Sequence, residues 1–300
     1  MADIVVVGSL NHDLTVVTEN HPRPGETVLG TRHYSDNGGK GANQAVAAAR
    51  LGGAVAMIGR VGDDLHGHGL REALAAEGVD VAGIGLDPTT ATGLAVITID
   101  SRAENTIVVS PGANSTLHPE HLEESAALIA EARVLLAQCE IPMDVLAAAA
   151  RAANGTFCLN PAPATDLAPG ILARTDVLIP NRTELGVLAG LPEPASVDEV
   201  SNAVRRLETD ASVVVTLGSE GALLVSEGSV ARFQAPDVEA VDPTGAGDAF
   251  CGAVAEALSR GLSLESAIER AVVAGALATT IPGAQSSLPK ADQVERMLQS

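Results

Sequence analysis

Short runs of aliphatic residues alternate along most of the chain with segments in which alanine, leucine and valine recur at helical spacing. The first run, Ile4–Val7, ends at Gly8 and predicts a buried strand. Further strands are predicted at 54–59, 133–137, 156–159, 176–179 and 212–217, and helices at 41–51, 65–77, 118–131, 142–153, 182–189, 197–209, 247–260 and 263–280. Strands that alternate with helices of this length predict an α/β fold, an open and mostly parallel sheet flanked by helices.

Two segments break this alternation. Residues 14–34 and 92–109 each contain a pair of short β-type runs with no helix between them. Such strands predict a small β appendage over the strand ends, where open α/β sheets bind ligands. We therefore expect a single α/β domain over residues 1–300, with a small β-strand lid built from about 14–34 and 92–109.

The composition supports a sheet that is covered on both faces. Hydrophobic residues make up 46% of the chain but aromatic residues only 1%, so the core is aliphatic, as in parallel sheets. The formal net charge of −20 argues against nucleic acids and anionic membranes as partners. It does not exclude a nucleotide, because backbone N–H groups and metal ions build local anion sites on acidic proteins.

Cysteine usage and the N-terminal residues bear on the compartment. Cys139, Cys158 and Cys251 are too few and too scattered for a disulfide framework or a zinc site. The N-terminal residues lack a signal-peptide pattern, and no apolar run approaches the ~18 residues needed to span a bilayer. We expect a cytoplasmic protein.

The strongest chemical signal is DPTGAGDAF at 242–250, which leads into a predicted helix. The small residues Gly245, Ala246 and Gly247 let a ligand approach the backbone, and the N–H groups of a helix start favour an anion. Asp248 lies in the first turn, where it could accept the proton of an attacking hydroxyl during phosphoryl transfer. An ordinary acidic N-cap behind a glycine turn is the alternative for an isolated GxGD.

Two further motifs carry polar side chains in glycine-rich surroundings. Residues 37–44 read NGGKGANQ and place Lys40 and Asn43 at the start of a predicted helix, although a flexible loop with a solvated lysine would look the same. Residues 8–13 read GSLNHD, and Asn11 and Asp13 share one face of an extended chain, although turn chemistry would also use them. Neither motif has the spacing of a P-loop or of a GxGxxG dinucleotide site, so a dehydrogenase is not favoured.

Together these motifs resemble the ribokinase-type carbohydrate kinases, the PfkB superfamily, from Val7 to Pro289. The segment 242–250 is similar to the C-terminal signature of that family, and GGKGANQAVAAARLG at 38–52 is similar to its N-terminal signature. Further matching segments are LNPAPA at 159–164, PNRTE at 180–184, VTLGSEG at 215–221 and GAQSSLP at 283–289.

The resemblance implies roles for individual residues. Asp248 is the implied catalytic base, next to an anion hole formed by Gly245, Ala246 and Gly247. The implied sugar ligands are Asn11, Asp13, Gly39, Lys40, Gly41, Asn43, Glu140 and Asp248 itself. The implied ATP-binding residues are Asn181, Thr216, Gly218, Ser219, Gly221 and Gly247. The implied K⁺ site comprises Asp242, Thr244, Ala278, Ile281, Gly283 and Ser287, and Glu184 is implied to hold Mg²⁺ through water. Val272 departs from the family, which often has Asn or His there near the adenine.

The implied reaction is the transfer of the ATP γ-phosphoryl group to O5 of D-ribose, with Mg²⁺ and an activating K⁺ ion, in a homodimer that associates through the lid strands. Alternative acceptors are deoxyribose, fructose or a nucleoside such as adenosine or cytidine. A nucleoside is less favoured, because Tyr34 and three phenylalanines offer little aromatic surface for stacking. A non-catalytic sugar or nucleotide sensor is a second alternative, against which the presence of Asp248 argues.

Overall fold

The computed structural model describes residues 2–102 and 104–299, which form a nine-stranded sheet and a smaller four-stranded sheet. The larger sheet has the order β13-β12-β11-β10-β9-β8-β1-β4-β5, and its first seven strands from the β5 edge are parallel. Its strands are β1 (Ile4–Val7), β4 (Val55–Gly62), β5 (Asp80–Asp87), β8 (Val134–Gln138), β9 (Thr156–Asn160), β10 (Val177–Leu178), β11 (Ser212–Thr216), β12 (Ala222–Ser226) and β13 (Ser229–Phe233). The open, mostly parallel sheet predicted from the sequence is confirmed.

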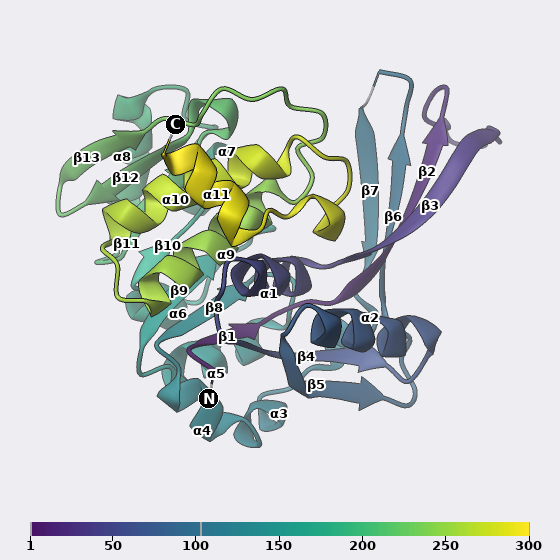
Figure 1. Ribbon diagram of the computed structural model, residues 1–300, viewed down its shortest axis with the longest axis horizontal. Helices are drawn as coiled ribbons and strands as arrows, with labels where there is room; N and C mark the ends of the chain where they lie inside the picture. Colours follow the sequence, from purple (N-terminus) through teal and green to yellow (C-terminus); the bar gives the residue numbers. More distant parts are fainter. Residues whose placement is uncertain (1, 103, 300) are drawn as a thin grey trace.

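Helices cover both faces of this sheet (Figure 1). One face carries α1 (Lys40–Arg50), α2 (Leu65–Ala76), α9 (Ala246–Ser259), α10 (Leu264–Ala278) and α11 (Ala291–Leu298). The other carries α3 (Glu120–Glu123), α4 (Ala126–Glu131), α5 (Met143–Ala152), α6 (Pro169–Arg174), α7 (Arg182–Ala189) and α8 (Val197–Arg206). Strand β1 shows why the strands are continuously aliphatic, because Ile4 and Val6 contact the first layer while Val5 and Val7 contact the second.

Several elements differ from the sequence prediction. The single helix predicted at 118–131 is wrong: α3 ends in a 3₁₀-type bond from the N–H of Ser125 to Leu122, and α4 begins after it. Strands β5, β12 and β13 and helices α6 and α11 were not predicted. Strand β13 is an edge strand with four of its five residues exposed, so it lacks the aliphatic run of a buried strand.

The four-stranded sheet stands beside the end of the larger sheet (Figure 1). Its order is β3-β2-β6-β7, with β2 (Asn11–Thr18) parallel to β6 (Gly93–Ile99) and the outer strands β3 (Gly30–Gly38) and β7 (Asn105–Ser110) antiparallel to their neighbours. Only residues 8–10 separate β1 from β2, so a core strand runs almost directly into this sheet. Both predicted strand pairs are present, but the first begins at Asn11, earlier than expected.

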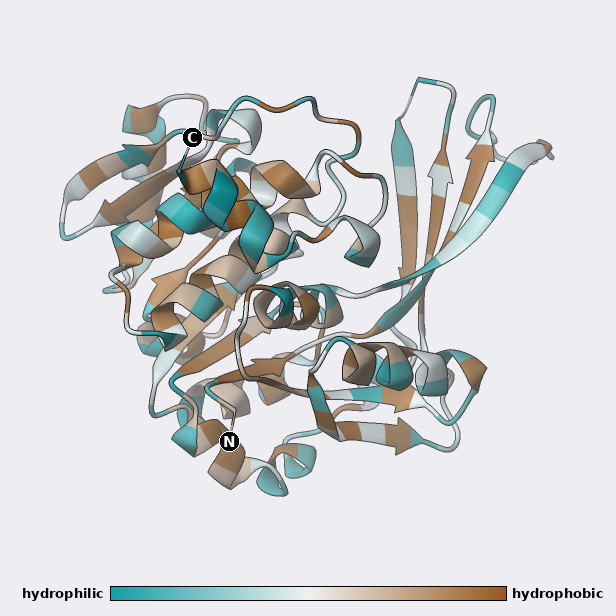
Figure 2. Ribbon diagram, viewed as in Figure 1, coloured by the Kyte–Doolittle hydropathy of each residue, from teal (hydrophilic) through white to brown (hydrophobic). Residues whose placement is uncertain are grey.

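Strand β7 forms one edge of the small sheet and is exposed along its whole length. Its apolar side chains Ile107, Val108 and Val109 are 54%, 70% and 45% exposed. Figure 2 shows this apolar character in β6 and β7, against the polar β3 at the opposite edge. In the part of the chain that the structure describes, no helix is both long and apolar enough to cross a membrane.

Candidate active site

Asp248 lies where the two sequence signatures meet. It is the third residue of α9, and its side chain is buried against α1. The amide of Asn43 donates a hydrogen bond to one carboxylate oxygen (2.9 Å), and the amide of Gln44 donates to the other (3.0 Å). The helices approach closely at Gly252, where a Cβ would lie 2.6 Å from the Cβ of Ala47. This close contact brings α1 within hydrogen-bond reach of the carboxylate.

The start of α9 presents free backbone donors. Gly245 adopts the left-handed conformation (φ 78°) and precedes the first helical residue. Ala246 donates its N–H to the carbonyl of Pro243 at 3.2 Å, whereas the N–H groups of Gly247 and Asp248 have no partner among residues 2–102 and 104–299. Apart from its chain neighbours and the backbone of α9, no atom of the described residues lies within 4 Å of where a Cβ on Gly247 would stand. Open space and unpaired N–H groups at a helix start suit an anion.

A second group of polar side chains comes from β2 and the segments next to it. Asn11 and Asp13 lie on β2, and Asn11 accepts a hydrogen bond from the amide of Asn114 (2.8 Å). Glu140 accepts hydrogen bonds from the hydroxyl of Ser9 (2.5 Å) and from the backbone N–H of Lys40 (3.1 Å). These bonds tie β2, the start of α1 and the end of β8 into one polar surface.

Asp13 has an unusual charge environment. Burial, followed by the carboxylates of Asp36, Glu140 and Asp248, raises the pKa of Asp13 to about 7, against the opposing effect of Lys40. One of its carboxylate oxygens is buried and has no hydrogen-bond partner. The side chain fits only because residue 38 is glycine, since a Cβ there would overlap the carboxylate. An unpaired carboxylate oxygen in such a place suits a ligand hydroxyl.

Lys40 and Glu184 line a cavity of about 200 Å³ together with Asn181, Gly247 and Asp248. Burial opposes the charge of Lys40, but the carboxylates of Asp248, Glu140 and Glu184 outweigh it and raise the pKa of the ammonium. Asn181 and Glu184 form a capping box at the start of α7, each side chain accepting the other residue's N–H. Burial raises the pKa of Glu184, with Lys40 and the N–H of Asn181 acting against it.

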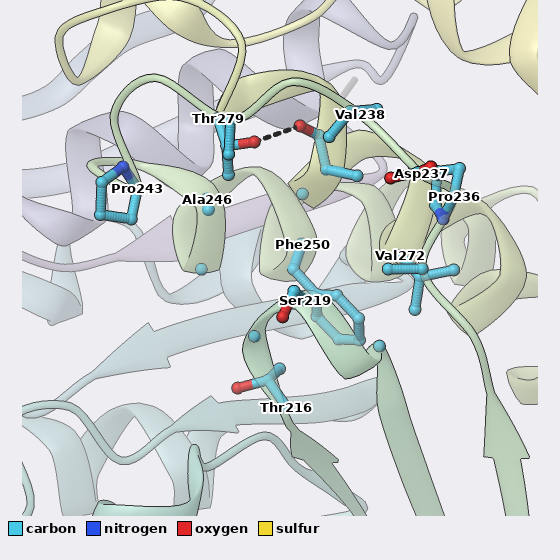
Figure 3. Close-up of a pocket in the computed structure, with 17 residues that line it drawn as sticks. Thr216, Ser219, Pro236, Asp237, Val238, Pro243, Ala246, Phe250, Val272 and Thr279 are labelled. Carbon is cyan, nitrogen blue, oxygen red and sulfur yellow. Dashed lines mark hydrogen bonds between the residues drawn. The ribbon is translucent and has the colours of Figure 1, made fainter.

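A larger cavity of about 490 Å³ adjoins the first and shares Thr216, Pro243 and Gly247 with it. Its remaining lining includes residues of the turn after β11 and apolar side chains of α9 and α10. Figure 3 shows Thr216 and Ser219 on one side of the cavity, and Phe250, Val272 and Val238 around it. Gly218 and Gly221, both with positive φ, also line it. The apolar lining next to free N–H groups suits a ligand with a flat ring and a phosphate chain.

The predicted cation-site residues lie on two adjoining loops. The carboxylate of Asp242 accepts hydrogen bonds from the N–H groups of Thr244 and Gly283, both at 2.9 Å. Ser287 is buried on the 3₁₀ turn Gln285–Ser287 and donates its hydroxyl to the carbonyl of Ala284. Ala278 ends α10, and Ile281 is 44% exposed in the turn that follows. Asp242, Thr244 and Gly283 are therefore in direct contact, with Ala278, Ile281 and Ser287 on the segment that flanks them.

The model of the pfkB family of carbohydrate kinases matches residues 1–291. The chain belongs to this family. The family resemblance inferred from the motifs is thus confirmed.

Relatives within the family include enzymes with two acceptors. The chain is 37% identical to the ribokinase of Haemophilus influenzae, over 99% of this chain and 98% of that protein. It is 34% identical to the deoxyribokinase of Salmonella typhi, again over 99% of this chain and 98% of that protein. The solved structure of Arabidopsis thaliana ribokinase complexed with ribose and ATP superposes with a TM-score of 0.93 at 33% identity, covering 100% of this chain and 99% of that one.

Three buried amides at the site were not assigned a role from the sequence. Gln44 and Asn160 stand inside the motifs 38–52 and 159–164, but the polar character of those motifs did not show which side chains point inward. Asn114 follows β7 in the turn Gly112–Thr116 and bonds to the backbone of Leu10 as well as to Asn11. A Gly-Ala-Asn sequence directly after a strand was the signal that could have identified it.

Proposed function

We propose that this protein is a ribokinase that transfers the γ-phosphoryl group of ATP to O5 of D-ribose, giving D-ribose 5-phosphate and ADP. The observation that carries the proposal is the position of Asp248, between the free N–H groups of α9 and the polar surface of β2 and α1. The similarity to ribokinases over nearly the whole chain supports ribose as the acceptor.

In the proposed reaction Asp248 accepts the proton of the 5-hydroxyl as that oxygen attacks phosphorus. The anion hole implied at Gly245, Ala246 and Gly247 is revised here, because Ala246 already donates its N–H to Pro243. The free N–H groups of Gly247 and Asp248 would stabilise the charge that develops on the transferred phosphoryl oxygens. The Lys40 ammonium lines the same cavity and adds a full positive charge. Because these donors are already fixed by α9 and α1, little reorganisation accompanies the reaction.

Mg²⁺ fits the phosphate cavity. The carboxylate of Glu184 lines it, held in place by the capping box with Asn181, and hard oxygen ligands of this kind suit Mg²⁺ carried by phosphates and water. When bound, the ion neutralises phosphate charge. We assign Glu184 to hold it through water, and Asn181 to orient Glu184.

We assign the sugar to the polar surface formed by Asn11, Asp13, Lys40, Asn43 and Glu140. The backbone at Gly39 and Gly41 belongs to this surface because both residues contact the 8–11 segment so closely that a Cβ would lie within 2.9 Å of its backbone. The nucleotide is assigned to the larger cavity, with Thr216, Gly218, Ser219 and Gly221 along its phosphates and ribose. The aliphatic Val272 would contact the base without a directional hydrogen bond.

The four-stranded sheet is proposed to act as a lid on a single α/β domain. Its strand β2 carries two proposed sugar ligands, and closure of this sheet over ribose would exclude water from the reacting oxygen. We also propose that two copies associate through β7, because an edge strand with unpaired backbone groups and three exposed aliphatic side chains favours pairing with another chain. Ile107→Asp would then convert a dimer into a monomer in sedimentation analysis, and an unchanged mass would exclude this interface.

A monovalent cation is proposed at the loops that carry Asp242 and Gly283. The Asp242 carboxylate already bonds to the backbone of both loops. A Cβ on Gly245 would lie 3.0 Å from the carbonyl of Ala284, so the turn before α9 contacts the loop that carries Gly283. A weakly hydrated K⁺ ion bound by carbonyl oxygens there, with side-chain oxygens of Asp242, Thr244 and Ser287, would fix the shape of the anion hole. A cytoplasmic location is proposed because ATP is available there and the three cysteines are unpaired.

A second acceptor, 2-deoxyribose, is favoured by the similarity to Salmonella deoxyribokinase. The test is an ADP-release assay with ribose, 2-deoxyribose, fructose and adenosine, repeated with Asp248→Asn. We expect ribose to give the highest kcat/KM and the near-isosteric Asn variant to lose ~10²–10⁴ in rate while keeping its fold. A higher kcat/KM for 2-deoxyribose would transfer the assignment to the second acceptor, and a fully active Asn variant would refute Asp248 as the base.

A further inference from the structure

A continuous chain of buried side-chain amides ends at Asp248. The amide nitrogen of Asn160 donates to the backbone carbonyl of Ile179 (2.9 Å), and its oxygen accepts from the amide nitrogen of Gln44 (3.1 Å). The same nitrogen of Gln44 donates to Asp248 (3.0 Å), and the oxygen of Gln44 accepts from Gln138 (2.6 Å). Gln44 and Gln138 are fully buried, and Asn160 is 8% exposed.

The backbone carbonyl of Ile179 fixes the polarity of this chain. A carbonyl can only accept, so Asn160 must turn its NH₂ group toward Ile179 and its oxygen toward Gln44. Gln44 must then present its NH₂ group to Asn160, and both hydrogens are used, one on Asn160 and one on Asp248. If the Gln44 amide were rotated by half a turn, its oxygen would face the side-chain oxygen of Asn160 and a carboxylate oxygen of Asp248, neither of which can donate. The donor that faces Asp248 is therefore specified by the backbone carbonyl that directly follows β10.

Glycine at position 8 provides the space for this chain. A Cβ on Gly8 would overlap the side-chain oxygen of Gln138, which is buried and has no hydrogen-bond partner of its own. The fold thus leaves room for Gln138 at the cost of one unpaired oxygen, while every polar atom of Gln44 is satisfied.

We propose that Gln44 is a positioning residue for the catalytic base: it holds the Asp248 carboxylate as an acceptor in one orientation, and Asn160 acts through it. The proposal rests on Asp248 being the base of the proposed kinase reaction. Asn43 bonds the other carboxylate oxygen, so the two adjacent residues of α1 fix the carboxylate from both sides. Asp248 also lines the phosphate cavity, where the attacking hydroxyl would meet the transferred phosphoryl group.

Four ionisable groups face Asp248 from the surrounding elements. Lys40 lies on α1, Asp13 on β2, Glu184 on α7 and Cys251 one turn further along α9. Lys40 is the only cation in this group, and Asp13 and Glu184 are like charges that disfavour a second carboxylate. The neutral amides of Asn43 and Gln44 therefore hold the Asp248 carboxylate without adding a further charge to the site.

The decisive experiment is the pH dependence of kcat in Gln44→Met and Gln44→Glu. Methionine keeps the volume and removes the donor, and glutamate places an oxygen against Asp248. We expect kcat to fall at least about 10-fold and the acid limb of the profile to move upward by about one pH unit or more, with the larger shift for Gln44→Glu. KM for both substrates should change less than about threefold, since the free cavity surface is unaltered.

Glu256→Gln is the matched control, because Glu256 is a buried carboxylate of the same helix that lies away from the cavities. This amide–carboxylate exchange should change thermal stability and leave the acid limb in place. Because Asn160 also lines the phosphate cavity, Asn160→Leu is judged by the acid limb: it should move the limb in the wild-type background and add no further shift in the Gln44→Met background. A Gln44→Met enzyme that melts earlier but keeps the wild-type acid limb would overturn the proposal, as would additive shifts of the acid limb from the two substitutions.

A measurement without turnover separates this proposal from the kinase assignment. The carbon-13 shift of the Asp248 carboxyl, followed against pH in the substrate-free protein, should show its transition at higher pH in Gln44→Met than in the wild type. An unchanged transition would refute the role of Gln44 whatever the substrate. A wild-type protein that turns over no sugar would refute the kinase assignment instead.

Discussion

Ribose binding is expected to depend on pH through Asp13. The pKa of this carboxyl is raised to about 7 by burial and by Asp36, Glu140 and Asp248, so near neutral pH a large share of the protein carries a proton there. A sugar hydroxyl that donates to the unpaired carboxylate oxygen stabilises the charged form. Binding should therefore release this proton, and the affinity for ribose should rise with pH.

The magnitude follows from linkage. If the carboxylate is fully ionised in the complex, the apparent Kd scales with one plus the ratio of protonated to ionised Asp13, so it should weaken about 10-fold from about pH 8 to about pH 6. The proton released per ribose should be roughly 0.9 at about pH 6, 0.5 at about pH 7 and 0.1 at about pH 8.

Isothermal titration calorimetry in two buffers of different ionisation enthalpy measures both quantities. Asp13→Asn is the control, because it removes the titrating group and keeps the size of the side chain. Its affinity for ribose should be lower and independent of pH, even though the adjacent His12 is retained. A wild-type Kd that stays constant between about pH 6 and about pH 8, with no buffer-dependent heat, would refute the assignment of Asp13 to the sugar.

Three further outcomes are expected. In the absence of sugar, Asp13→Asn should raise the thermal midpoint at about pH 8. The folded pKa of Asp13 is raised to about 7, so the wild-type protein loses roughly 2–4 kcal/mol of stability as the pH rises from the unfolded pKa of the carboxyl to about 7. A wild-type midpoint that does not change across that pH range would contradict this. In a denaturation assay, Gly252→Ala should lower the free energy of unfolding by about 1–3 kcal/mol, and it should also lower kcat, because its Cβ would lie 2.6 Å from that of Ala47. The control Gly69→Ala in α2, where the new Cβ would have nothing within 4 Å, should be neutral or stabilising in the same assay. At matched ionic strength K⁺ should support faster turnover than Na⁺ or choline, and Asp242→Ala should remove the difference; equal rates in all three salts would refute the cation site.

The backbone plan was largely predictable because its signals are local. Aliphatic runs and helical periodicity placed β1 and α7 at the residues where they occur, and the other predicted strands and helices within a few residues of their observed ends, except at 118–131. Elements without those signals were missed, such as the short edge strand β13, which is mostly exposed, and helix α11, whose one buried residue is Val294.

The site was predictable only as a set of residue types. The motifs identified Asp248, Lys40 and Asn43 as chemical groups, but not their partners. The bond from Gln44 to Asp248 spans 204 positions and exists because Gly252 lets α9 approach α1. The direction of the Asn160 amide is set by a backbone carbonyl, which no side-chain pattern reveals. Contacts of this kind follow from the assembled fold.

The placement of the proposed base on α9 also has a consequence for synthesis of the chain. Ribosomes produce the proposed sugar-binding residues of β2 and α1 about 200 residues before Asp248, in keeping with the separation of 205 positions between Asn43 and Asp248. If Asp248 is the base, a nascent chain that has folded the N-terminal strands has a polar surface but no proton acceptor. Activity would then begin only when α9, eleven of whose residues are buried, docks against α1. Two fragments divided in the loop between β13 and α9 should each be inactive, and they should regain activity only on reassociation.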